Sequence, residues 1–249
     1  MRSLIDIGYT WPWTHGHLIV TAVALAGCWL AWRWRAHWAL RTLVVVVLAW
    51  SLAGFLVVQF VFRFNDIPAL PTHGFLASGY GRVLDLGAGS GRSSIMVLRG
   101  RPNATLVALD NFSATYIRNH GPAKLLANLR AAGVDRRASL QTADMRSLPF
   151  PDASFDAVVS AYAVDHLDRD GIRRTLLEAA RVLRPRGQIL LQVMYPDGWM
   201  RFAWGPMLLH GANGPRLQAR WQSFLQQAGF DVVEEGREPA SLYLLGVKR

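Results

Sequence analysis

A short apolar strand that runs directly into a glycine-rich turn constrains this fold more than any other feature of the sequence. Residues 82–92 read RVLDLGAGSGR, with Gly87, Gly89 and Gly91 directly after the strand. Glycines let the backbone turn tightly there and come close to a ligand, and the helix expected over 92–99 points its N-terminus at that ligand. The pattern predicts a nucleotide-like ligand at the end of a β-strand.

The glycine spacing separates this turn from two common phosphate-binding loops. The third glycine comes one residue earlier than in the dinucleotide fingerprint G-x-G-x-x-G, and Arg92 takes the last position of that pattern. No Gly-Lys-Ser/Thr follows, so the turn is not a P-loop. A second strand ends at Asp110, about twenty residues on, where an acidic side chain can accept hydrogen bonds from both ribose hydroxyls. Asp110 has capping of a helix as its alternative role.

The downstream sequence alternates between strand and helix patterns. One strand ends at Asp144, the next covers 155–160, and a helical pattern leads through Pro-Arg-Gly into an apolar strand over 188–193. This alternation predicts a parallel sheet.

The chain here resembles the class I S-adenosylmethionine-dependent methyltransferases, close to the group called methyltransferase type 11. The resemblance rests on VLDLGAGSG, VALD, TADMRSLPF, FDAVVSAYAVDHL and ARVLRPRGQILL, which follow one another in the order of the family, and it covers roughly 75–249. It implies a Rossmann-like, mostly parallel sheet of seven strands with helices on both faces and an antiparallel last strand. We expect this domain to cover 67–249.

The resemblance also implies which residues contact the cofactor, S-adenosylmethionine. Asp85 and the glycine turn face its methionine part, Asp110 its ribose and Asp144 its adenine amino group, while the end of the fourth strand lies under the sulfonium. The residues implied are Asp85, Gly87, Ala88, Gly89, Gly91, Asp110, Asn111, Asp144, Met145, Ser160 and Tyr162. On this basis the whole cofactor site lies after residue 80.

Methyl transfer from a sulfonium mainly requires alignment of the acceptor, and a base only where the acceptor keeps its proton. His166 is the candidate base, oriented by Asp165 or Asp168. The alternative is structural: Asp165 or Asp168 caps the next helix and His166 packs beneath it. Four further side chains are weaker candidates: Tyr116, His120, Tyr195 and His210.

The first part of the chain contains two long apolar stretches without any charged residue. Residues 16–32 and 42–62 contain no charged side chain, and tryptophans flank both stretches. The second stretch forms a helix roughly 30 Å long, the thickness of a bilayer core. A transmembrane hairpin within domain 1–66 is therefore expected. A signal peptide and a buried core hairpin are the alternatives, although a dense basic start and a small-residue cleavage site are missing.

Topology requires a choice between two rules. The link between the two stretches carries Arg33, Arg35 and Arg41, which the positive-inside rule places in the cytoplasm. A domain that uses a cytosolic cosubstrate must itself be cytoplasmic, and we give this requirement precedence. We therefore expect a two-helix membrane protein whose catalytic domain is cytoplasmic.

Composition and missing motifs argue against two kinds of partner, nucleic acid and metal ions. The net charge is +10, but no dense Lys/Arg run with interleaved aromatics occurs, so nucleic acid is not an expected partner. The single cysteine, Cys28, lies in the apolar part, which leaves no cysteine metal site, and we expect no metal. The Trp-, Met- and Gly-rich stretch 195–221 suits an apolar acceptor pocket, contact with the bilayer, or a plain hydrophobic lid.

These observations favour a membrane-anchored S-adenosylmethionine-dependent methyltransferase that acts on an apolar or membrane-associated small molecule or lipid. The alternatives are the same fold acting on a soluble metabolite or transferring an aminopropyl group, and a non-catalytic membrane subunit that binds the cofactor. The oligomeric state does not follow from the sequence.

Overall fold

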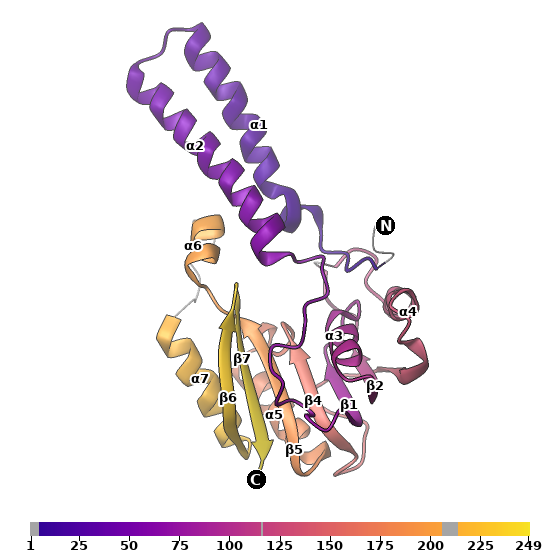
Figure 1. The fold of residues 1–249 in the computed structure, drawn as a ribbon. Coiled ribbons are helices and arrows are strands. Elements are labelled where there is room, and N and C mark those ends of the chain that lie inside the picture. The colour runs from indigo at the N-terminus through magenta and orange to yellow at the C-terminus, as the bar shows by residue number, and fades with distance from the viewer. Residues whose placement is uncertain (1–4, 116, 206–213) are drawn as a thin grey trace.

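The computed structural model describes residues 5–115, 117–205 and 214–249. It consists of a long helical hairpin and a sheet flanked by helices (Figure 1). The hairpin projects away from one end of the sheet (Figure 1). The expected seven-stranded, mostly parallel sheet behind two long apolar helices is thus confirmed.

The hairpin consists of α1 (Trp11–Arg33), α2 (Trp38–Leu56) and η1 (Val57–Phe62), a π-helix that continues α2. A proline in the first turn of α1 suits that position, because the N–H it lacks has no partner there. The link is limited to 34–37, shorter than the sequence suggested, and Arg35 takes a left-handed conformation with φ 50° to make it. Both helical arms are long and apolar enough to cross a membrane.

Polar side chains lie between the two helices of the hairpin. The Thr21 hydroxyl donates to the Ser51 hydroxyl at 3.0 Å. The ring of His17 packs against Gly54, where a Cβ would come within 2.3 Å of a ring carbon and push the helices apart. The outer surface of the hairpin exposes large apolar side chains: Ile19, Val23, Leu25, Trp29, Trp32, Leu43, Val45, Val46, Leu52 and Leu56.

The sheet has the order β3-β2-β1-β4-β5-β7-β6. Its strands are β1 (Tyr80–Leu86), β2 (Asn103–Asp110), β3 (Ala138–Thr142), β4 (Phe155–Ala161), β5 (Leu183–Met194), β6 (Phe230–Glu238) and β7 (Ser241–Lys248). Strands β1 to β5 pair in parallel, whereas β7 is antiparallel to both β5 and β6. The strands at Asp110 and over 155–160 end within a residue of expectation, but β3 stops at Thr142, before Asp144.

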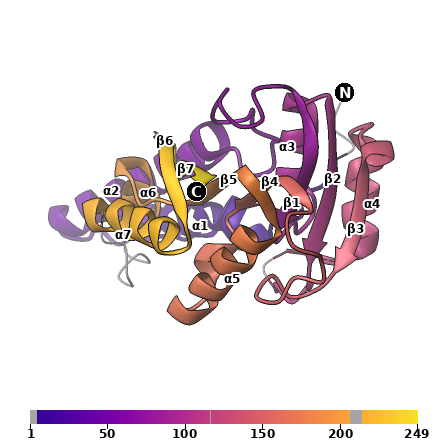
Figure 2. The same cartoon turned by 90° about the horizontal axis from the view of Figure 1, so that it is seen from below.

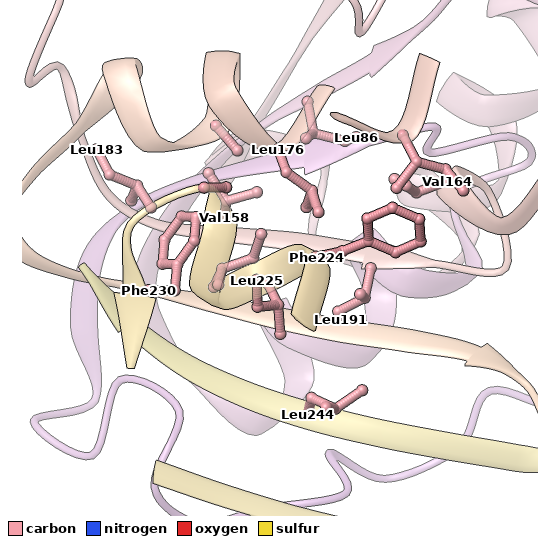
Figure 3. Packing of buried hydrophobic residues seen from close by; sticks show 14 of the residues in the cluster. Leu86, Val158, Val164, Leu176, Leu183, Leu191, Phe224, Leu225, Phe230 and Leu244 are labelled. Carbon is pink, nitrogen blue, oxygen red and sulfur yellow. The ribbon is translucent and has the colours of Figure 1, made fainter. Parts of the chain in front are cut away.

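Helices cover both faces of the sheet. They are α3 (Arg92–Gly100), α4 (Pro122–Ala131), α5 (Arg169–Val182) and α7 (Gly214–Gln227), with short turns η2 (Asp135–Arg137) and η3 (Val164–His166). Alternate residues of β1 enter different cores: Val83 packs with α3 and α4, and Leu84 packs with α5 and α7. Figure 2 shows α5 and α7 on one side of the sheet and α3 on the other, and Figure 3 shows the core on the α5 side.

A short helix, α6 (Gly198–Trp204), joins the hairpin to the sheet domain. The indole N–H of Trp50 on α2 donates to the Phe202 carbonyl at 2.9 Å. Val58 and Phe62 of η1 are buried against α6. The base of the hairpin is therefore packed onto the part of the chain that follows β5 (Figure 1).

Candidate functional site

The strand order locates the site before any side chain is considered. The chain passes from β1 outward to β2 and β3 and then returns to β4 beside β1. Ligands of open α/β sheets bind in the crevice at such a reversal, at the carboxyl ends of the strands. A cavity of about 340 Å³ lies there, and the glycine turn forms one of its walls.

The glycine turn is held in a conformation that larger residues would resist. Gly87 and Gly89 have φ of 76° and 57°. A Cβ on Gly87 would lie 2.3 Å from the Cβ of Ala163 and 3.1 Å from the Met145 methyl group. The N–H groups of Gly87 and Ala88 donate to the Leu109 carbonyl at 2.8 and 3.0 Å, which fixes the turn to β2. The close packing leaves space for a ligand only on the cavity side.

Asp110 connects the glycine turn to the end of β2. One carboxylate oxygen accepts the Gly89 N–H at 2.7 Å, and the other accepts the Phe112 N–H at 2.5 Å. His120 approaches the second oxygen with its Nε2 at 3.9 Å. Asp110 and its neighbour Asn111 both line the cavity. The carboxylate thus faces the cavity from the β2 end, and it does not cap a helix as the alternative role required.

Asp85 lies beneath the turn and is fully buried. The hydroxyls of Ser93 and Ser94 donate to one of its oxygens at 2.7 and 2.5 Å. The other oxygen has no hydrogen-bond partner among the described residues. Burial raises the pKa of the carboxyl to about 6, against the hydrogen bonds from the two serines. Asp85 is not a wall residue of the cavity, so the structure places this carboxylate behind the turn, where it binds the first turn of α3.

Of the two residues expected to contact adenine, one lines the cavity and the other does not. Met145 lines the cavity. Asp144 does not, because both of its oxygens bind the guanidinium of Arg146 at 2.6–3.0 Å, and the bond to Arg146 holds the pKa of this carboxyl below its usual value. Gly91 and Ser160 also lie outside the cavity wall: Gly91 is the N-cap of α3, and the Ser160 hydroxyl donates to the Leu86 carbonyl at 2.9 Å.

Tyr162 and His166 border the cavity at the end of β4. Tyr162 has φ of 55°, a strained conformation for an aromatic residue and one that clusters at functional sites. Asp165 accepts the Met194 N–H at 3.0 Å, and burial raises the pKa of its carboxyl. Asp168 is the N-cap of α5 and accepts the Gly171 N–H, so it does not orient His166. The exposed His166 faces the cavity instead of packing beneath α5.

A second cavity of about 120 Å³ adjoins the first. The two share Tyr9, Arg92, Tyr162 and His166. The remaining walls come from the base of the hairpin, α6 and the ends of β5 and β6: Trp13, Phe62, Phe64, Met194, Met200, Trp204, Pro239 and Ala240. Part of the stretch 195–221 therefore lines an apolar cavity.

Several wall residues were outside the sequence-based expectation. Ile7, Tyr9 and Pro68 line the first cavity, so it is not formed wholly by residues after 80. Arg92 is a further wall residue, and its place in the fingerprint was the one signal that could have found it. Among the weaker candidates, His120 lines the first cavity and Tyr195 lines neither. Tyr116 and His210 lie outside the described residues.

The residues present fit S-adenosylmethionine. The glycine turn leaves the backbone open to the ligand, and the Asp110 carboxylate lines the cavity at the end of β2, where it can accept hydrogen bonds from the hydroxyls of a ribose. Asp85 lies beneath the turn, fully buried and outside the cavity wall, with one carboxylate oxygen unpaired among the described residues. Met145 supplies an apolar wall for a ring. These residues come from the ends of three neighbouring strands, β1, β2 and β3.

Comparison with known proteins agrees with this geometry. Residues 83–187 match the family model described as a methyltransferase domain. A 27-O-demethylrifamycin SV methyltransferase of Amycolatopsis mediterranei is 37% identical over 113 residues, which are 44% of this chain and 37% of that protein. A ubiquinone/menaquinone biosynthesis C-methyltransferase of Dinoroseobacter shibae is 32% identical over 110 residues, 44% of this chain and 41% of that protein. This chain spans about two fifths of these relatives.

Solved structures share the fold. A SAM-dependent methyltransferase from Methanosarcina mazei superposes with a TM-score of 0.57 at 18% identity, covering 73% of this chain and 99% of that one. An O-methyltransferase family 2 protein from Planctomyces limnophilus, solved in complex with apigenin, gives a TM-score of 0.54 at 20% identity, covering 80% and 59%.

Proposed function

Because this chain belongs to the class I S-adenosylmethionine-dependent methyltransferases, we propose that it transfers a methyl group to an apolar, membrane-associated small molecule or lipid. The supporting observation is the second cavity, which is apolar, adjoins the cofactor cavity, and is walled by the base of the hairpin. Such a cavity suits the acceptor site of an apolar substrate. Its position gives the hairpin a role that a soluble acceptor would not require.

Membrane anchoring is part of the proposal and is supported by where the hairpin keeps its apolar side chains. Trp29, Val23 and Leu43 are each more than half exposed, whereas a core helix of a soluble protein buries such residues. Hydrocarbon would cover this surface, and the tryptophans at both ends suit the interfaces. With the hairpin inserted, the catalytic domain lies on the cytoplasmic side, where the cofactor is made.

The residues of this chain bind the cofactor, align the acceptor with its methyl group and remove the acceptor's proton. S-adenosylmethionine supplies a methyl group that is already activated by its sulfonium. The glycine turn and Asp110 hold it from the cavity wall, and Tyr162 lines both cavities where they adjoin. Asp85 supports the turn from beneath through Ser93 and Ser94. His166 faces both cavities and accepts a proton from the acceptor, while Asp165 beside it stabilises the protonated imidazole.

The relatives support methyl transfer but leave the acceptor open. One is named for O-methylation of a malonyl-acyl-carrier protein and another for C-methylation in quinone biosynthesis. Both matches cover less than half of this chain, and neither relative is matched over two thirds of its own length. The acceptor is therefore inferred from the cavity walls rather than from these names.

Transfer of labelled methyl groups to lipid extracts tests the proposal. Full-length protein in bilayers, given methyl-labelled S-adenosylmethionine, should label an organic-soluble product. His166→Ala should lower turnover by about 10²–10⁴-fold with unchanged S-adenosylhomocysteine affinity. The matched control is His73→Ala, which removes an exposed histidine outside both cavities. Label only in water-soluble products would contradict the apolar acceptor, and a loss below threefold in His166→Ala would return His166 to a structural role.

A further inference from the structure

The segment before the hairpin is docked onto the sheet domain by specific contacts. The Asp6 N–H donates to the Asn128 side chain at 2.9 Å, and the Asn128 amide donates back to the Asp6 carbonyl at 2.9 Å. The same amide donates to the Ser90 carbonyl of the glycine turn at 2.8 Å. One buried asparagine thus connects the N-terminal segment with the turn that faces the cofactor.

Three further contacts fix the direction of this segment. The Arg118 N–H donates to the Gly8 carbonyl at 2.7 Å, and Tyr9 pairs with Ile117 in an antiparallel bridge. Lys124 binds the Asp6 carboxylate at 2.9 Å. The segment therefore crosses the cofactor cavity, and α1 begins directly after it.

The segment contributes two side chains to the site. Ile7 is 2% exposed and lines the cofactor cavity. Tyr9 lines both cavities, and its ring lies 5.7 Å from that of Phe64 in the apolar cavity. Tyr9 thus stands where the methyl donor and the acceptor would meet.

Polarity is distributed unevenly around the apolar cavity. The four residues shared with the cofactor cavity, Tyr9, Arg92, Tyr162 and His166, are its polar wall residues. Its other walls are apolar. Burial raises the pKa of Tyr9. The charge of Arg92 lowers this pKa, whereas Tyr162 and Asp165 raise it further, so these polar groups lie close enough to interact electrostatically. An acceptor that fits this arrangement has an apolar body and one polar group at the end nearest the cofactor.

We propose that the segment 5–9 completes the reaction site: Ile7 closes the cofactor cavity, and Tyr9 is a positioning residue for the hydroxyl of an apolar alcohol or phenol. This inference rests on the proposed methyl transfer. The acceptor oxygen bonds to the methyl carbon as the carbon–sulfur bond of the cofactor breaks, S-adenosylhomocysteine is left, and the hydroxyl proton passes to His166. The tyrosine O–H directs the oxygen toward the cofactor. The helix that follows then couples the bilayer to the site.

The test uses full-length protein in nanodiscs with 4-hexylphenol as the acceptor. Tyr9→Phe should lower kcat about tenfold, the equivalent of one hydrogen bond, with KM for S-adenosylmethionine and S-adenosylhomocysteine affinity unchanged. Its matched control is Tyr80→Phe, on an exposed tyrosine at the start of β1. Ile7→Ala should weaken S-adenosylhomocysteine binding about tenfold, because an apolar wall is removed.

The outcomes separate this inference from the proposed function. A wild-type kcat in Tyr9→Phe overturns the positioning role. An unchanged S-adenosylhomocysteine affinity in Ile7→Ala overturns the place of the segment in the cofactor site. If the wild-type protein binds S-adenosylhomocysteine but methylates no phenol, the hydroxyl acceptor is overturned along with the role of Tyr9. The Ile7→Ala titration then still decides whether the segment belongs to the cofactor site.

Discussion

The sheet domain and the hairpin place their apolar residues on opposite sides. In the sheet domain, Val158 and Leu191 are fully buried between strands and helices (Figure 3). In the hairpin, Val46 is 56% exposed, while Thr21 and Ser51 are buried between the helices. The sheet domain builds its own core, whereas the hairpin leaves its large apolar side chains uncovered. The proposed membrane anchoring would supply the missing cover for the hairpin, and it predicts that the same substitution acts differently in the two parts.

Val158→Asp should have the largest effect. The side chain is fully buried in β4, and an unpaired carboxylate there should destabilise the sheet domain by about 4 kcal/mol or more. Urea unfolding followed by tryptophan fluorescence measures it. A variant with near-wild-type stability would show that the core on this side of the sheet is not formed as described.

Val46→Asp should act on membrane insertion and leave the fold of the sheet domain intact. A carboxylate near the middle of a membrane helix costs about 2.5–3.5 kcal/mol on insertion scales. Carbonate extraction should release this variant more readily than wild type. Val233→Asp is the control, because Val233 is 58% exposed on β6 and should change neither property. Equal extraction of Val46→Asp and Val233→Asp would contradict the membrane assignment.

Asp85 is a fully buried carboxylate inside the sheet domain, and its effect on stability should depend on pH. Burial raises its pKa from 3.8 to about 6, so the folded state binds more protons than the unfolded state between these values. Stability without cofactor should fall as pH rises through this window and then level off. Asp85→Asn has no such charge and should gain about 2–3 kcal/mol relative to wild type between pH 4 and 7. A pH-independent difference would contradict the raised pKa.

Thr21→Val should have the smallest effect. It removes the hydrogen bond to Ser51 inside the hairpin, and such bonds average about 0.6 kcal/mol in membrane proteins. Reversible unfolding in mixed micelles, run as a double-mutant cycle with Ser51→Ala, isolates the pair. A coupling of several kcal/mol would mean that the hairpin interior is organised by polar contacts, as a water-soluble bundle with a buried network would be.

Local patterns predicted much of the sheet domain. The glycine turn, the strand to Asp110 and the helix after Gly91 follow from residue spacing, because each depends on neighbours in the chain. Asp144 illustrates the limit: its nearest partner is Arg146, two residues away, and no strand pattern reveals that competition. Tyr9 lines the same cavity as Tyr162, and the segment that carries it is held by Asn128, which binds Asp6 from 122 residues away in the chain. Such contacts have no periodic signature.

The hairpin was predicted from its lack of charge, but its attachment was not. The sequence indicated two helices with an arginine-containing link, and both are present. Packing of α6 against the hairpin arises from the hydrogen bond between Trp50 of α2 and the Phe202 carbonyl and from the stacking of Trp204 on Phe62 of η1, which composition alone does not pair. For the same reason the stretch 195–221 could be recognised as unusual without its place being known.

The hairpin base that walls the apolar cavity has a kinetic consequence. If the acceptor enters from the bilayer, the enzyme and its substrate meet by lateral diffusion in two dimensions, and the bulk concentration of acceptor has little meaning. The rate should then follow the mole fraction of acceptor in the membrane, and adding inert phospholipid at constant total acceptor should slow the reaction by surface dilution.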